Sequence, residues 1–330
     1  MKIKAILNGL ILMMVISSIL TFGSGKVKAD NAGGWVVGTW SGALNTLNLS
    51  PTLQGDMLFG YNNSNRIGKW SHVALVQKSS NYDTSSILPK NPTTPIQRIY
   101  GWDGLTVEAT TPSGVYKNYY QSHFKRYDAA TITTVNLKID KRLVISKAMA
   151  YKGSYTVLTS YYKNDLWYCT KLASRAYYDV TGSVLGGDNV ATWPETLYYD
   201  KRLVYVSGSK SSKYDGRGIY AASANASIAN PTNIGYDLTS SKIHSPSLEK
   251  VNIDAETKSL NEQRRKEAAL EGKQVNYTLR YTPNYLKPGF ADFLTRSVKE
   301  GKINLSDSSE LNRLNISLND AKSILNLTSK

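Results

Sequence analysis

Cysteine is almost missing from this chain, because its 330 residues contain a single thiol, Cys169. No intrachain disulfide can form, so an ordinary hydrophobic core must hold a chain of this length together. Histidine is nearly as scarce, with imidazoles only at His72, His123 and His244. One thiol and three widely separated imidazoles give no recognisable metal-ligand spacing. We therefore expect neither a metal nor another cofactor.

Long apolar runs are also lacking, apart from one at the N-terminus. Two lysines precede an apolar run over residues 6–22, and residues 27–29 then place small side chains at the third and first positions before a cut. This pattern predicts a signal peptide over residues 1–29 and a mature chain that begins near Asp30. The run is short for a bilayer crossing of roughly 20 residues, so an uncleaved anchor is the weaker alternative. We expect a secreted, extracellular protein without a membrane span, and association with the cell wall is an option.

A dense run of one charge sign is missing too. The net charge of +15 falls to +11 once the leader, with its four lysines and no acid, is removed. Scattered lysines and arginines argue against nucleic acid as a partner, and the polyanions nearer to an exported protein are cell-wall polymers, anionic lipids and acidic glycans. A basic surface that serves only solubility is the alternative. The oligomeric state is left open by these patterns.

Short strand-like runs are abundant between Gly55 and about Gly208, where tyrosine, valine and leucine are frequent. Such runs, bounded by turn residues, predict β-strands. The clearest examples are Met57–Phe59, Val73–Val76, Leu105–Val107 and Leu203–Val206. A connection rich in Ser, Asn and Pro over residues 77–101 interrupts them. We expect this connection to be mobile or functional, because long ordered loops are uncommon.

One segment among these strands has helical periodicity. From Asp165 to Tyr178, Cys169 and several apolar residues recur at three- and four-residue steps, which predicts an amphipathic helix. Asn164 or Asp165 would cap its start, and Gly182 lies just past its end. Cys169 then falls in the first turn, where unpaired N–H groups and the helix dipole favour a thiolate and could hold an oxyanion. A buried, inert cysteine is the alternative.

The composition changes after the last of these strand runs, where Ser, Asn, Lys and Gly replace aromatic residues. We place a boundary there, which gives a domain over residues 30–208 and a C-terminal extension over residues 209–330 whose role no pattern indicates. Residues 254–270 are charged and helix-favouring, with Gly272 as a stop, and apolar residues recur over 311–318. The extension is therefore expected to be partly helical.

Four side chains are candidates to assist the thiol. His72 opens a strand-like run that could hold its imidazole rigidly at the edge of a cleft, although a structural histidine is the alternative. His123, set among aromatic residues, and His244, in the polar tail, are weaker candidates. Glu108 lies in a later strand pattern, where its carboxylate could orient an imidazole on a neighbouring strand or simply be solvated.

Four short motifs follow one another in a definite order. They are Gly55–Phe59, Ser71–Val76, Val107–Ala109 and Trp167–Leu172. This order resembles the circularly permuted NlpC-type papain-like hydrolases of the YiiX/YebB-like branch. In that family a Gly-Asp strand, a histidine strand, a Val-Glu-Ala strand and a Tyr-Cys-Ser/Thr helix occur in turn. The resemblance covers about residues 55–208, including a Pro-x-x-Leu segment at 194–197.

The resemblance implies an α+β, permuted papain-like domain in which an antiparallel sheet packs on the cysteine-bearing helix. It also implies Cys169 as nucleophile, His72 as base and Glu108 as third catalytic group. Tyr168, next to the nucleophile, would help to shape the substrate or oxyanion site, or would only pack. Two features depart from the family: the Pro-rich insert over residues 77–104, and the C-terminal extension, which has no counterpart.

These features together predict a secreted cysteine hydrolase that acts through a Cys-His-Glu triad and an acyl-enzyme. We expect an amidase or peptidase whose substrate is a peptide or amide, derived from the cell wall. A lipid acyl hydrolase or acyltransferase of the same superfamily is an alternative. Another is a non-catalytic glycan- or cell-wall-binding protein, in which the 23 tyrosines and six tryptophans stack on sugars and Cys169 is structural.

Export gives the first prediction. The mature protein should begin near Asp30, because the lysine-flanked apolar run ends in a cleavable small-residue motif. N-terminal sequencing of the secreted protein checks this. Recovery of an intact Met1 in a membrane fraction would contradict it.

Overall fold

The computed structural model describes residues 45–62, 69–79, 96–101, 104–109, 124, 127–151, 154–155, 162–187, 192–209, 253–284, 287 and 289–328. For residues 78–79, 96–101, 104–109, 154–155 and 327–328 the description is limited to the backbone. The predicted signal peptide and the two weaker histidine candidates, His123 and His244, lie outside the described residues.

A six-stranded antiparallel sheet forms the centre of the described fold, in the order β3-β4-β2-β1-β5-β8. Its strands are β1 (Met57–Tyr61), β2 (Trp70–Ser79), β3 (Ile96–Gly101), β4 (Gly104–Ala109), β5 (Ala129–Val135) and β8 (Leu203–Gly208). All four strands predicted from the sequence are confirmed. A separate parallel pair joins β6 (Ser154–Tyr155) to β7 (Leu166–Trp167).

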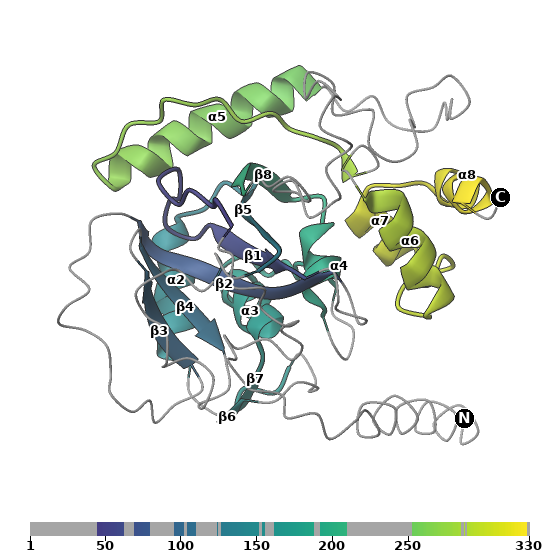
Figure 1. Cartoon of the computed structure of the whole chain (residues 1–330), viewed down its shortest axis with the longest axis horizontal. Helices are drawn as coiled ribbons and strands as arrows, with labels where there is room; N and C mark the ends of the chain where they lie inside the picture. Colours follow the sequence, from purple (N-terminus) through teal and green to yellow (C-terminus); the bar gives the residue numbers. More distant parts are fainter. Residues whose placement is uncertain are drawn as a thin grey trace. The chain divides into compact units, whose positions relative to one another are not determined.

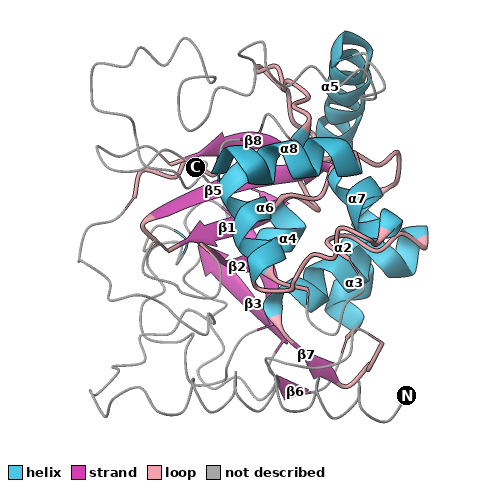
Figure 2. Cartoon of the chain, turned by 90° about the vertical axis from the view of Figure 1, so that its right-hand side faces the viewer, coloured by secondary structure: helices cyan, strands magenta, loops and turns pink. Residues whose placement is uncertain are grey.

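The two faces of the sheet carry two separate hydrophobic layers. Side chains alternate along a strand, so Met57 and Phe59 of β1 join a large layer, whereas Leu58 joins a smaller one on the opposite face. The large layer is covered by helices α2 (Lys141–Ala150), α3 (Cys169–Thr181) and α4 (Pro194–Tyr198), which gather on one side of the sheet in Figure 2. The fold is therefore mixed α+β, with an antiparallel sheet packed on the cysteine-bearing helix.

The start of the cysteine-bearing helix differs from the prediction. Neither Asn164 nor Asp165 caps it, because α3 begins at Cys169 and its N-cap is Tyr168. The residues just before it form β7, which pairs with β6. The Lys171 side chain donates hydrogen bonds to the backbone carbonyls of Lys163 and Leu166. The predicted end is confirmed, since Gly182 caps α3 in the left-handed conformation.

The Pro-rich connection is shorter than expected. β2 continues to Ser79, and β3 begins at Ile96, so the ends of the interval 77–101 are strands. β3 then forms a hairpin with β4, in which Gly101 pairs with Gly104. No strand is predicted at β3 from the sequence, because the proline and serine residues around it indicate a loop.

The described part of the C-terminal extension contains four helices, which confirms that the extension is partly helical. They are α5 (Ile253–Leu270), α6 (Phe290–Lys299), α7 (Ser308–Leu314) and α8 (Leu318–Thr328). Phe290, Phe293 and Leu314 belong to the large hydrophobic layer, and the Phe293 ring stacks on Tyr199 at 4.4 Å between centroids. The change of composition near residue 208 is thus not accompanied by a gap in the packing. Whether residues 30–208 fold alone stays a prediction.

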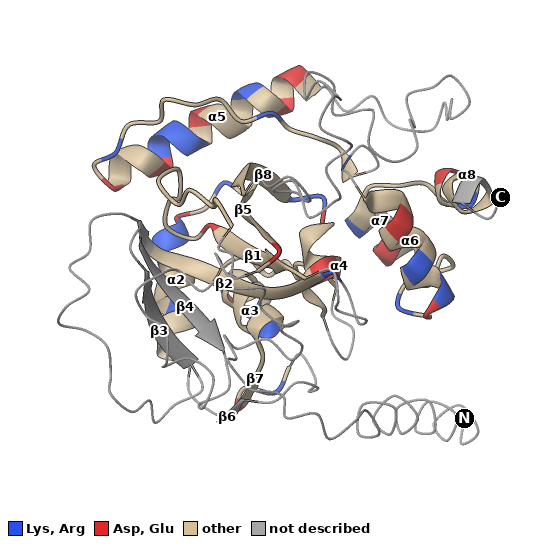
Figure 3. Cartoon of the chain, viewed as in Figure 1, with Lys and Arg blue, Asp and Glu red and all other residues tan. Residues whose placement is uncertain are grey.

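Helix α5 lies beside β8 in Figure 1, where Leu260 packs against Val204. Both signs of charge alternate along this helix in Figure 3, and most of these side chains are exposed. Arg264 is different, because its side chain is only 1% exposed. Its guanidinium makes two hydrogen bonds of 2.6 Å to the carboxylate of Asp56, which is fully buried just before β1.

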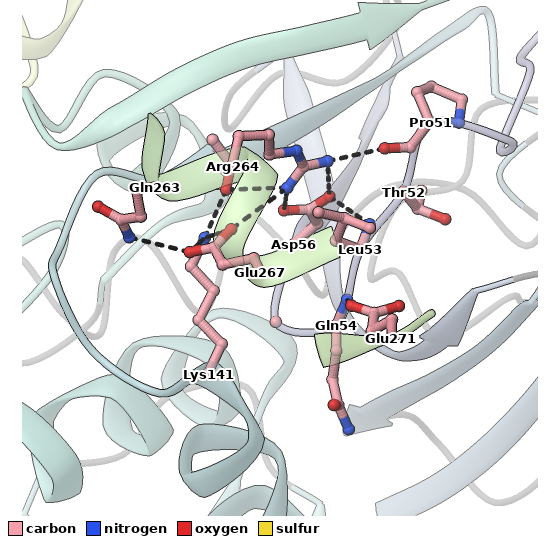
Figure 4. Close-up of polar contacts among 12 residues, drawn as sticks. Pro51, Thr52, Leu53, Gln54, Asp56, Lys141, Gln263, Arg264, Glu267 and Glu271 are labelled. Atoms are coloured by element: carbon pink, nitrogen blue, oxygen red, sulfur yellow. Dashed lines mark hydrogen bonds and ion pairs between the residues drawn. The ribbon is translucent and has the colours of Figure 1, made fainter. Parts of the chain in front are cut away.

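The surroundings of this ion pair are also polar, as Figure 4 shows. Arg264 donates to the carbonyl of Pro51 at 2.7 Å, and the backbone N–H of Leu53 donates to Asp56 at 2.8 Å. Nearby, the Lys141 ammonium from α2 meets Glu267 of α5 at 2.9 Å. A bidentate, fully hydrogen-bonded pair of this kind joins the extension to the start of the sheet.

The Asp56–Arg264 pair gives the second prediction. Arg264→Leu should lower the free energy of unfolding by about 3–5 kcal/mol, because it leaves the Asp56 carboxylate buried and uncompensated. Chemical denaturation measures the loss. Arg265→Leu is the matched control, because Arg265 lies on the exposed side of the same helix and should change stability by less than about 0.5 kcal/mol. Equal effects of the two variants would contradict the assignment.

Candidate active site

Cys169 is the first residue of α3, the position at which a helix offers unpaired N–H groups and the positive end of its dipole. The backbone of Tyr168 is extended and no side chain caps the helix start. The thiol itself is buried, with 8% of Cys169 exposed. The sequence prediction that Cys169 lies in the first turn is confirmed.

Tyr168 fixes the approach to this helix. Its phenol oxygen accepts a hydrogen bond of 3.0 Å from the backbone N–H of Thr192, which precedes α4. Burial raises the pKa of Tyr168 to about 12, so the phenol stays neutral at physiological pH. Within the described contacts, Tyr168 therefore supports the helix start by packing and by this bond. Its predicted contribution to a substrate or oxyanion site stays a prediction.

His72 lies on β2, opposite Gly60 of β1, and is fully buried. A β-bulge precedes it, because Gly60 pairs with His72 but the next residue, Tyr61, pairs with Trp70. Bulges redirect neighbouring side chains, and this one leaves Trp70 in the large hydrophobic layer while His72 points to the smaller one. The imidazole is thus held on a rigid strand, as the sequence suggested.

The backbone of β2 explains how His72 and Cys169 meet. Val76 makes two backbone hydrogen bonds of 2.8 Å with the segment that leads into β1, one as donor and one as acceptor. Successive N–H groups along a strand point to opposite sides, so the N–H of Val73, three residues earlier, points away from β1. On that side, the described pairing with β4 begins only at Leu75. The Cys169 sulfur lies close enough to the His72 side chain and to the Val73 N–H for both to stabilise its thiolate form.

Electrostatics at this edge favour the thiolate. Burial raises the pKa of the Cys169 thiol, but the charge of His72 and its hydrogen bond to the sulfur act in the opposite direction. The Thr170 hydroxyl, 3.7 Å from the sulfur, and the Val73 N–H lower the pKa further. The net result is a pKa below the ordinary value of a cysteine, as a nucleophile requires.

Glu108 is described only by its backbone. It lies in β4 next to Val107, which pairs with Leu75 of β2, and it pairs with Gln97 of β3 on its other side. The strand that carries it therefore adjoins the strand that carries His72. Its side chain lies outside the described residues, so its role as third catalytic group stays a prediction.

Sequence reasoning missed several residues around the pair. Thr170 was visible only as the residue after the cysteine, and nothing in the sequence singled out the N–H of Val73. Phe124 and Tyr127, whose rings stack near His72, appeared only as part of an aromatic-rich stretch. Their positions depend on contacts between distant segments, which local patterns do not show.

Other kinds of site find no support in the part of the chain that the structure describes. No group of three or more His, Cys, Asp or Glu side chains there could hold a metal ion. None of the helices described is long and apolar enough to cross a membrane.

No family model, curated protein or solved structure matches this chain.

The Cys169–His72 contact gives the third prediction. The alkylation rate of Cys169 by iodoacetamide, followed against pH, should have its midpoint below about 8.5, the value for an unperturbed thiol. His72→Ala should raise this midpoint, because it removes the neighbouring charge and hydrogen bond. Cys169 is the only thiol, so mass spectrometry reports it directly. A wild-type midpoint at or above about 8.5 would contradict the assignment.

Proposed function

We propose that this protein is a secreted cysteine hydrolase with Cys169 as nucleophile and His72 as base. The observation that carries the proposal is that the His72 imidazole lies close enough to the Cys169 thiol, at the N-terminus of α3, to lower the pKa of that thiol. The chain has one thiol, and it lies beside an imidazole at a helix end, although the two are far apart in the sequence. A thiol paired with a base in this way is an activated nucleophile.

The reaction follows from these groups. His72 takes the proton of Cys169, and the thiolate attacks the acyl carbon of an amide to form a C–S bond. The first-turn N–H groups of α3 are placed to stabilise the oxyanion. As the C–N bond breaks, the His72 imidazolium gives its proton to the leaving amine. His72 then deprotonates a water molecule, which attacks the thioester. The C–S bond breaks, the carboxylic acid product leaves, and the His72 imidazolium returns its proton to Cys169.

Glu108 completes the proposed triad as the group that orients His72. The adjacency of β2 and β4 supports this role, because a carboxylate on a neighbouring strand can reach an imidazole. We also propose the permuted papain-like arrangement, in which the histidine strand precedes the cysteine helix. The observed order, β1 and β2 before β4 and α3, supports it.

The substrate class is proposed on charge and location. A mature chain with net charge +11 and a predicted signal peptide suits anionic cell-wall material, so we favour peptide or amide bonds of wall peptides. Acyl transfer to or from lipids uses the same nucleophile and is the alternative chemistry.

The binding-protein alternative is less well supported. Stacking on sugars needs exposed aromatic faces. Of the described aromatic residues, Tyr162 and Tyr205 are exposed, whereas Trp70 and Trp167 are at most 2% exposed and Tyr177 and Phe59 are fully buried. The buried rings build the core. A low thiol pKa would also have no purpose at a structural cysteine.

The fourth prediction tests hydrolysis. Wild-type mature protein and Cys169→Ala are compared on wall peptide fragments, aminoacyl amides and phospholipids. We expect amide hydrolysis that Cys169→Ala lowers by at least about 10³-fold, because the covalent step is lost. Glu108→Gln should lose less activity, since an amide still accepts the orienting hydrogen bond. Equal turnover by Cys169→Ala would sink the proposal, and release of fatty acid alone would favour the lipid chemistry.

A further inference from the structure

Two aromatic rings of the smaller hydrophobic layer, with centroids 5.7 Å from each other, lie on one side of the His72 ring. Phe124 stacks on it with centroids 5.7 Å apart and planes inclined by 26°, and Tyr127 lies 6.4 Å away at 8°. All three side chains are buried. Both rings are inclined to the imidazole by 26° or less, and buried side chains packed in this way limit the orientations open to His72.

The place of Tyr127 depends on a glycine. Gly60 is the cross-strand partner of His72, so a side chain at Gly60 would share its face of the sheet. A Cβ atom there would lie 2.6 Å from the Tyr127 ring, closer than real contacts allow. The Tyr127 ring therefore lies directly on the backbone of β1, beside the imidazole, in space that only glycine leaves open.

The two rings are tied together by one side chain. Asn45, from the segment before β1, donates through its amide nitrogen to the carbonyls of Phe124 at 2.7 Å and of Tyr127 at 3.0 Å. Its amide oxygen accepts the N–H of Leu47 at 3.0 Å. Asn45 is buried, with 9% exposed. Loss of its amide would leave two buried carbonyls without these bonds.

We propose that Asn45, Tyr127 and Phe124 are positioning residues that hold the His72 imidazole in the plane from which it reaches Cys169. This inference rests on the proposed function and deepens it. The cysteine approaches the edge of β2 from the helix-covered face, and the positioning residues act from the opposite face. The Phe124 ring, at 5.7 Å, is within the distance of about 6 Å over which an aromatic ring attracts a cation, so it favours the imidazolium that forms when His72 takes the thiol proton.

The fifth prediction uses the pH midpoint of Cys169 alkylation together with kcat and KM. Tyr127→Leu and Asn45→Ala should each raise the midpoint by about one pH unit, which is about a tenfold fall in alkylation rate near pH 6. The loss of activity should fall on kcat, because substrate contacts are unchanged. Tyr127→Phe keeps the ring and should stay close to wild type.

Leu49→Ala is the matched control. Leu49 belongs to the same hydrophobic layer, so its truncation should lower the melting temperature without moving the midpoint. If Tyr127→Leu does not fold, Gly60→Ala replaces it, since the added methyl displaces the Tyr127 ring without removing any group.

Two outcomes separate the two proposals. A low wild-type midpoint that His72→Ala raises, with no change in Tyr127→Leu and Asn45→Ala, would overturn the positioning role and leave the proposed function standing. A wild-type midpoint that is not lowered would instead overturn the Cys169–His72 pairing.

Discussion

The packing of the first turn of α3 against β2 is the constraint on which the candidate site depends. A backbone N–H inside a protein needs an acceptor, and the described pairing with β4 begins only after Val73. The Cys169 sulfur lies near this N–H group, which helps to stabilise the thiolate at the first residue of α3. His72 is the next residue along the same strand. Two consecutive residues of β2 thus bring a base and an N–H donor to the thiol.

A second constraint fixes the sheet relative to the C-terminal extension. Arg264 reaches from α5 to Asp56, whose own backbone carbonyl accepts the N–H of Val76 on β2. The ion pair is therefore linked to Val76, which lies three residues along β2 from Val73, and the N–H of Val73 is near the sulfur. Since a buried pair of charges stays stable only when both partners are present, α5 and the β1–β2 hairpin depend on each other. The extension is in this sense part of the scaffold of the site.

The sequence alone predicted the elements whose signal is local. Period-two runs located β1, β2, β4 and β8, and three- and four-residue periodicity located the helix that carries Cys169. Gly182 marked the end of that helix because a left-handed residue there favours glycine. The scarcity of thiols and imidazoles reduced the choice of catalytic groups to Cys169 and a few partners. These inferences need only neighbouring residues or composition.

Only the tertiary structure decided which of these groups meet. It placed His72 at Cys169 because strand register and a bulge set the position of the imidazole. It moved the start of α3 to Cys169, because β7 pairs with β6 instead of extending the helix. It also showed which groups Arg264 and Asn45 bind. In the sequence these residues are only one charge in a charged helix and one amide in an Asn-rich chain. Their partners lie far away in the sequence, and contacts of that range leave no periodic trace.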